Sequence, residues 1–163
     1  MKTYSIIEAA SADLGDVAVL FRAYAQSLTV DLGAQGFERE LAGLPGDYAA
    51  PGGALLIARD ATGAAAGCVA MRALSATVCE IKRLYVTPEA RGTGLGAALV
   101  SSIVEAAALR GYQQMNLDTL PHMHNAIQLY RRFGFEDIAP YGNHPYPGTI
   151  CLGRVLNNST AWR

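Results

Sequence analysis

Two hydrophobic periods alternate along the chain, and together they predict a mixed α/β fold. Apolar residues recur at helical spacing in four segments: residues 14–28, 35–42, 94–109 and 125–132. Alternating or continuous apolar runs, typical of strands, occupy residues 4–9, 54–59, 65–74, 77–86, 114–119, 135–138 and 149–156. The expected order is β-α-α-β-β-β-α-β-α-β-β, which combines a hairpin-rich first half with a βαβα second half.

One domain accounts for the whole pattern. The chain has 163 residues and is 51% hydrophobic, enough to form a single core without disulfides. No repeat, low-complexity stretch or linker divides it. We therefore expect a domain over residues 1–156 and a C-terminal tail over residues 157–163.

Charge and hydropathy limit the expected partners. The chain has 13 basic and 14 acidic residues, so its charges nearly balance. This argues against a nucleic-acid partner, since binding a phosphate backbone usually requires a basic surface. No apolar run approaches the roughly 20 residues needed to span a bilayer, and the first residues lack the apolar core of a signal peptide. We expect a cytoplasmic protein without a membrane partner, whose three cysteines are reduced and buried.

A glycine-rich loop between a strand and a helix predicts an anion site. The loop reads Arg91-Gly92-Thr93-Gly94-Leu95-Gly96. Glycines remove side chains where a backbone approaches a ligand closely, and a helix N-terminus offers unpaired N–H groups with a partial positive charge. Arg91 adds a fixed charge. A plain helix-capping loop is the alternative, which the Arg and the long amphipathic helix make less favourable.

The loop differs from two well-known phosphate loops. A Walker A loop needs Lys and then Ser or Thr after its last Gly, whereas Ala97 and Ala98 follow Gly96. The dinucleotide fingerprint needs G-x-G-x-x-G, whereas here the glycines run G-x-G-x-G.

At this point the chain resembles the GNAT acyltransferase superfamily. Its signature is Gln or Arg, two residues, Gly, one residue, then Gly or Ala, and Arg91, Gly94 and Gly96 match it. The resemblance implies a central, mostly antiparallel sheet flanked by helices, with acetyl-CoA as cosubstrate. It also implies that the loop amides bind the coenzyme A pyrophosphate. The pantetheine arm would meet the backbone of the preceding strand, at Leu84, Tyr85 and Val86.

A second segment, residues 125–135, is similar to the family pattern N-x-x-A-x-x-x-Y-x-x-x-G-F, with fewer residues between the Asn and the Ala. Tyr130, Gly134 and Phe135 fall at the matching positions. The resemblance implies that Asn125, Tyr130 and Arg132 contact the coenzyme.

Two residues are candidates for the chemistry. Tyr130 matches the family's proton donor to the leaving thiolate; the alternative is a half-buried tyrosine that only packs its ring. Glu80 lies at the spacing where some members carry a general base. The alternative for Glu80 is a structural ion pair with Lys82 or Arg83, and other members use a water chain instead of a base.

The expected function is transfer of acetyl from acetyl-CoA to a primary amine of a small molecule or a peptide. Two alternatives stay open: an acyl-CoA-binding sensor without turnover, and transfer of another acyl group to a protein acceptor. Asp118 and Thr119 end a strand and are expected either to line the acceptor site or to have a structural role in the turn. The resemblance implies that residues 141–148 border the acceptor pocket. The histidines are not spaced as metal ligands, so no metal is expected, and the resemblance allows a homodimer.

Overall fold

A seven-stranded mixed sheet with helices on both faces forms the framework of the computed structural model, which describes residues 3–142 and 146–156. The strands are β1 Tyr4–Glu8, β2 Ala54–Asp60, β3 Ala65–Ala73, β4 Val78–Val86, β5 Gln114–Thr119, β6 Glu136–Asp137 and β7 Ile150–Val155. The α-helices are α1 Leu14–Ser27, α2 Phe37–Ala42, α3 Leu95–Leu109 and α4 His124–Arg132. Short 3₁₀ turns cover Ser11–Asp13, Leu32–Gln35, Gly46–Tyr48 and Pro88–Ala90.

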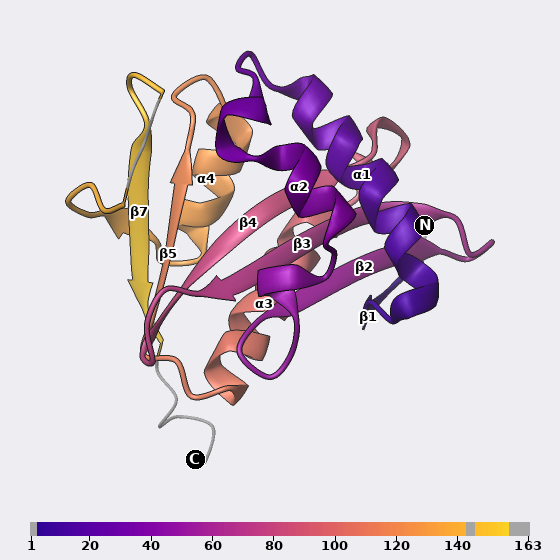
Figure 1. Cartoon of the computed structure of the whole chain (residues 1–163), viewed down its shortest axis with the longest axis horizontal. Coiled ribbons are helices and arrows are strands. Elements are labelled where there is room, and N and C mark those ends of the chain that lie inside the picture. Colours follow the sequence, from indigo (N-terminus) through magenta and orange to yellow (C-terminus); the bar gives the residue numbers. More distant parts are fainter. Residues whose placement is uncertain (1–2, 143–145, 157–163) are drawn as a thin grey trace.

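The sheet runs in the order β1-β2-β3-β4-β5-β7-β6, and β4 and β5 form its parallel pair. In Figure 1, α1 and α2 lie in front of the sheet and α3 lies behind it. Each face has its own apolar core. One contains Val17 and Phe21 of α1 with Phe37 of α2, and the other contains Leu99 and Ile103 of α3. The amphipathic stripes of the sequence therefore bury against opposite faces of one sheet.

The parallel strands β4 and β5 separate soon after they meet. Their register covers only Val78 to Glu80 on β4, opposite Gln114 to Asn116 on β5. Beyond Glu80 the two strands are no longer paired, while β5 stays paired with β7 along its full length. The edge of β4 that faces β5 is therefore without a strand partner from Ile81 onward, and a gap opens within the sheet.

A bulge interrupts β4 at Arg83. The β3–β4 register shifts between Cys68 and Ala70, and Arg83 has φ 62°. That conformation costs an L-residue about 1–2 kcal/mol. Glu40 of α2 accepts from Arg83 Nε at 3.0 Å and from Nη2 at 2.8 Å, and only 4% of the Arg83 side chain is exposed. This buried ion pair holds the bulge and joins α2 to the sheet.

The predicted order of elements is confirmed, with two local differences. The helix predicted over residues 35–42 begins at Phe37, because Gly36 adopts φ 75° and ends the preceding 3₁₀ turn. The strand predicted over residues 135–138 is only Glu136–Asp137, at the edge of the sheet. The tail over residues 157–163 lies outside the described residues. Within the described ranges, no helix is both long and apolar enough to cross a membrane.

Candidate functional site

The glycine-rich loop leads into the first turn of α3 and borders an open cavity of about 410 Å³, the loop cavity. Gly92 and Gly94 adopt φ 76° and 87°, and a Cβ added at either would have no atom within 4 Å beyond its own residue and its two chain neighbours. The space that a side chain would fill is therefore open to a ligand. The N–H groups of the first turn of α3 are the anion donors that the sequence predicts here.

The predicted coenzyme contacts divide into two groups. The loop cavity is lined by Leu84, Tyr85, Val86, Arg91, Gly92, Gly94, Leu95, Gly96 and Asn125. Thr93, Tyr130 and Arg132 are not among its lining residues: the Thr93 hydroxyl donates to Ala90 O at 2.5 Å, Arg132 is exposed on α4, and Tyr130 lines a second cavity, described below. Their predicted coenzyme contacts stay predictions.

Arg91 is fixed against the end of β4. Its Nε donates to Val86 O at 3.1 Å, and its guanidinium lies over the Tyr85 ring, 5.7 Å from the centroid. These contacts hold a permanent positive charge at the edge of the loop cavity, as an anion site requires.

A second, smaller cavity of about 60 Å³ occupies the gap between β4 and β5; we call it the gap cavity. Its walls come from both faces of the sheet: Tyr24 on α1 lies on one side and Tyr130 on α4 on the other. It shares Tyr24, Leu84, Met123 and Ala126 with the loop cavity. The two cavities therefore adjoin, and the separation of β4 and β5 makes this passage.

Tyr130 places a protonated phenol in the gap cavity. The residue is 6% exposed, and its ring packs edge-on against Phe135 with centroids 5.8 Å apart. Burial raises the pKa of the phenol well above its usual value, and electrostatic interactions with Tyr24 and Asp118 add to the effect. Within residues 3–142 and 146–156 the hydroxyl makes no hydrogen bond, so it is available to donate one.

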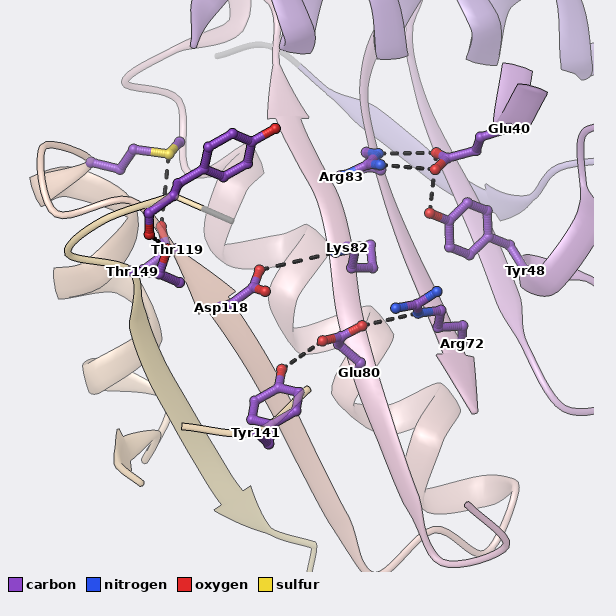
Figure 2. Close-up of polar contacts among 12 residues, drawn as sticks. Glu40, Tyr48, Arg72, Glu80, Lys82, Arg83, Asp118, Thr119, Tyr141 and Thr149 are labelled. Carbon is purple, nitrogen blue, oxygen red and sulfur yellow. Dashed lines mark hydrogen bonds and ion pairs between the residues drawn. The ribbon is translucent and has the colours of Figure 1, made fainter. Parts of the chain in front are cut away.

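Glu80 is buried between two donors, as Figure 2 shows. Its Oε1 accepts from Arg72 Nε at 3.0 Å, and its Oε2 accepts from the Tyr141 hydroxyl at 2.6 Å. The suggested pairing with Lys82 or Arg83 is wrong. Arg72 is the partner because it lies directly opposite Glu80 in the β3–β4 register, which the sequence alone does not reveal.

Burial and the neighbouring charge of Glu80 raise the pKa of Tyr141. The phenol therefore keeps its proton and remains a donor to the carboxylate.

A third cavity of about 200 Å³ lies beside Glu80; we call it the polar cavity. It is lined by Glu40, Tyr48, Arg72, Leu74, Glu80, Lys82, Arg83, Asp118, Tyr141 and Gly142. Lys82, Arg83 and Asp118 also line the gap cavity. The three cavities thus form a series from the glycine-rich loop, through the sheet, to a charged surface pocket.

The structure places the other predicted residues as follows. Asp118 lines both the gap and polar cavities, and Thr119 lines the gap cavity. Of the loop over residues 141–148, Tyr141 and Gly142 line the polar cavity, while residues 143–145, including His144, lie outside the described residues. The described part of the chain contains no cluster of His, Cys, Asp or Glu that could hold a metal ion.

Sequence reasoning missed Arg72 and the pairing of Arg83 with Glu40. Arg72 carries no motif and lies in an otherwise apolar strand. The one sequence feature that could have pointed to Arg72 is its charge, since it stands near the end of an otherwise apolar strand.

Comparison with known proteins gives consistent matches. Residues 51–137 match the family model for the acetyltransferase (GNAT) domain. An uncharacterized N-acetyltransferase from Schizosaccharomyces pombe is 42% identical over 141 residues, which cover 86% of each chain.

Solved structures agree on the fold. A GNAT-family acetyltransferase from Staphylococcus aureus aligns with TM-score 0.81 and 16% identity, over 95% of this chain and 100% of that one. A phosphinothricin acetyltransferase from Sinorhizobium meliloti, solved in complex with AcCoA, aligns with TM-score 0.70 and 24% identity, over 99% of this chain and 92% of that one.

Proposed function

The chain belongs to the GNAT acetyltransferase family, and we propose that it transfers the acetyl group of acetyl-CoA to a primary amine of a small molecule or a peptide. The observation that carries this proposal is the series of adjoining cavities. The gap cavity shares residues with the loop cavity on one side and with the polar cavity on the other. A cosubstrate held at the loop and an acceptor held in the polar cavity would meet between β4 and β5.

The loop cavity fits the diphosphate of coenzyme A. The first N–H groups of α3, the fixed charge of Arg91 and the open space at Gly92 and Gly94 together favour an extended anion. The edge of β4 at residues 84–86 has no pairing with β5, so its main-chain groups are free of sheet contacts on that side. We infer that they hold the pantetheine arm, and that a main-chain N–H there stabilises the thioester oxygen as charge develops on it.

The gap cavity favours a short acyl group. Its volume of about 60 Å³ is well below the roughly 150 Å³ of an engineered cavity that binds benzene. Tyr130 lies in its wall, and its O–H donates to the sulfur as the thiolate leaves. The amine attacks the thioester carbon, the C–S bond breaks, and the thiolate takes a proton.

Glu80 is the proposed acceptor of the proton that the amine loses. A carboxylate has about four acceptor positions, and Arg72 and Tyr141 occupy one on each oxygen. Glu80 also lines the polar cavity, as does Asp118. Glu80 can therefore accept the proton through water, and a water chain alone is the alternative.

An amine panel tests the function and the base together. Purified protein is incubated with acetyl-CoA and primary amines, and free thiol and acetylated product are measured. The wild type should release one thiol per acetyl-amine, and Glu80→Gln should lower kcat at least about tenfold. An unchanged kcat would assign proton removal to water. Tight acetyl-CoA binding without turnover of any amine would refute the enzyme and support a sensor.

A further inference from the structure

We propose that the polar cavity selects amines that also carry a carboxylate, and that Arg72 binds this carboxylate. The inference rests on the proposed function, because it assumes that the acceptor enters through the polar cavity. It identifies the acceptor as an amino acid whose reacting amine lies several bonds from its acid group.

The first argument is the way Arg72 is held. Glu80, with 3% of its side chain exposed, accepts from Arg72 Nε, and Glu80 is itself held by the hydroxyl of Tyr141 (Figure 2). The Arg72 side chain is 39% exposed. A buried carboxylate thus fixes the inner edge of the guanidinium, and the outer part reaches the cavity.

The outer edge of Arg72 is the part that suits a ligand. In the described ranges, the charged neighbour of its terminal nitrogens is Asp47, 3.9 Å from Nη1 and with 82% of its side chain exposed. Such an exposed, long ion pair contributes little stabilisation, so a ligand can displace Asp47 from Arg72 at little cost. The two Nη groups form the planar fork that binds a carboxylate through two parallel hydrogen bonds.

The charge of the cavity disfavours a polyamine. Glu40, Glu80 and Asp118 balance Arg72, Lys82 and Arg83, so the lining is formally neutral. A ligand of several positive charges would need an acidic lining. A ligand with one ammonium and one carboxylate matches the mixture of signs.

We place the amine of the acceptor where the polar cavity meets the gap cavity. Lys82 Nζ and Asp118 Oδ1 lie there, 4.0 Å apart across the separating strands (Figure 2). The charge of Asp118 attracts the ammonium, and the like charge of Lys82 favours the neutral amine that must attack.

Strand register sets the distance between the two ends of the acceptor. Arg72 lies opposite Glu80, whereas Lys82 and Asp118 lie two residues further along β4 and β5, which run in parallel from the Glu80–Asn116 pair. Two residues of strand span roughly 7 Å along the strand, and this is the least separation of the two ends, since β3 and β5 lie on opposite sides of β4. The amine nitrogen and carboxyl carbon of an α-amino acid are only about 2.5 Å apart. Since an extended chain advances about 1.25 Å per bond, at least five or six bonds are needed to cover this span.

The test compares 5-aminopentanoate with 5-aminopentanamide, which has the same amine, length and shape but a neutral amide in place of the carboxylate. We expect the wild type to show a kcat/KM about 10- to 100-fold higher for the acid than for the amide. Arg72→Gln should abolish this preference by raising KM for the acid. Because Arg72 also pairs with Glu80, the substitution changes kcat for acid and amide alike, so the diagnostic quantity is the ratio of their kcat/KM values, which should fall to about one. Arg72→Lys keeps the charge that pairs with Glu80 but loses the fork, so it should retain part of the preference.

Binding measurements separate this inference from the proposed function. Calorimetry with 5-aminopentanoate is performed on the coenzyme A complex of the wild type, of Arg72→Gln and of a control, Arg22→Gln, which removes an exposed arginine on α1. If the wild type turns over acid and amide equally, and Arg72→Gln does not change that ratio, the carboxylate site is overturned and acetyl transfer still stands. Arg72-dependent binding without turnover of any amine would support the carboxylate site and overturn acetyl transfer. No binding and no turnover would overturn both.

Discussion

Replacing Tyr130 by Phe removes one oxygen from the wall of the gap cavity and little else. The ring keeps its edge-on contact with Phe135, and the hydroxyl has no hydrogen bond among the described residues to lose. Burying an unbonded hydroxyl costs free energy, so the free energy of unfolding should stay the same or rise by about 1 kcal/mol. A rate defect in Tyr130→Phe would therefore not reflect a damaged fold.

The rate should fall because the leaving thiolate loses its proton donor. General acid catalysis contributes about 10²- to 10⁴-fold, and at about 1.36 kcal/mol per factor of ten this is about 2.7–5.4 kcal/mol of barrier. Burial raises the pKa of Tyr130, so the donor stays protonated throughout the range in which amines are assayed. Consequently the wild-type kcat should show no decline between pH 7 and about pH 10 that is due to Tyr130.

The assay combines steady-state thiol release, using the best amine of the panel, with calorimetric measurement of acetyl-CoA affinity. Tyr130→Phe should lower kcat and leave the Kd for acetyl-CoA within about twofold, because our proposal places the anionic part of the coenzyme at the loop. If kcat stays within threefold of the wild type, or if Kd rises as much as kcat falls, the proton-donor role is refuted.

Two further substitutions test the loop and the bulge. Gly94→Val should weaken acetyl-CoA binding at least tenfold in calorimetry; Gly63→Val, with nearly the same φ (88° against 87°) but lining none of the three cavities, should not. If both variants lose the same acetyl-CoA affinity, the cause is backbone strain and not a side chain that fills the loop cavity. Glu40→Ala leaves the buried Arg83 unpaired and should lower the free energy of unfolding by about 3 kcal/mol in urea. The exposed pair of Glu38 with Arg22 is the control, since Glu38→Ala should cost less than about 1 kcal/mol; similar losses at both positions would contradict the role of Arg83.

The sequence by itself determined the features that depend on neighbouring residues. Hydrophobic periods specify helices and strands because side-chain direction repeats every 3.6 or 2 residues. The loop was predictable because φ values such as those of Gly92 and Gly94 are readily adopted only by glycine. The motif around Tyr130 covers α4 and the few residues directly after it, so the position of Tyr130 on that helix followed from local structure.

Only the tertiary structure decided which distant residues meet. Arg72 faces Glu80 because of the β3–β4 register, and Glu40 reaches Arg83 across 43 positions of sequence. The sequence interpretation sought partners for Glu80 within three residues along the same strand, where local spacing applies. The gap between β4 and β5 likewise has no sequence signal, because it depends on where pairing between two distant strands stops. The physical reason is common to all three: strand register and helix packing minimise the free energy of the whole sheet, and no short segment contains that information.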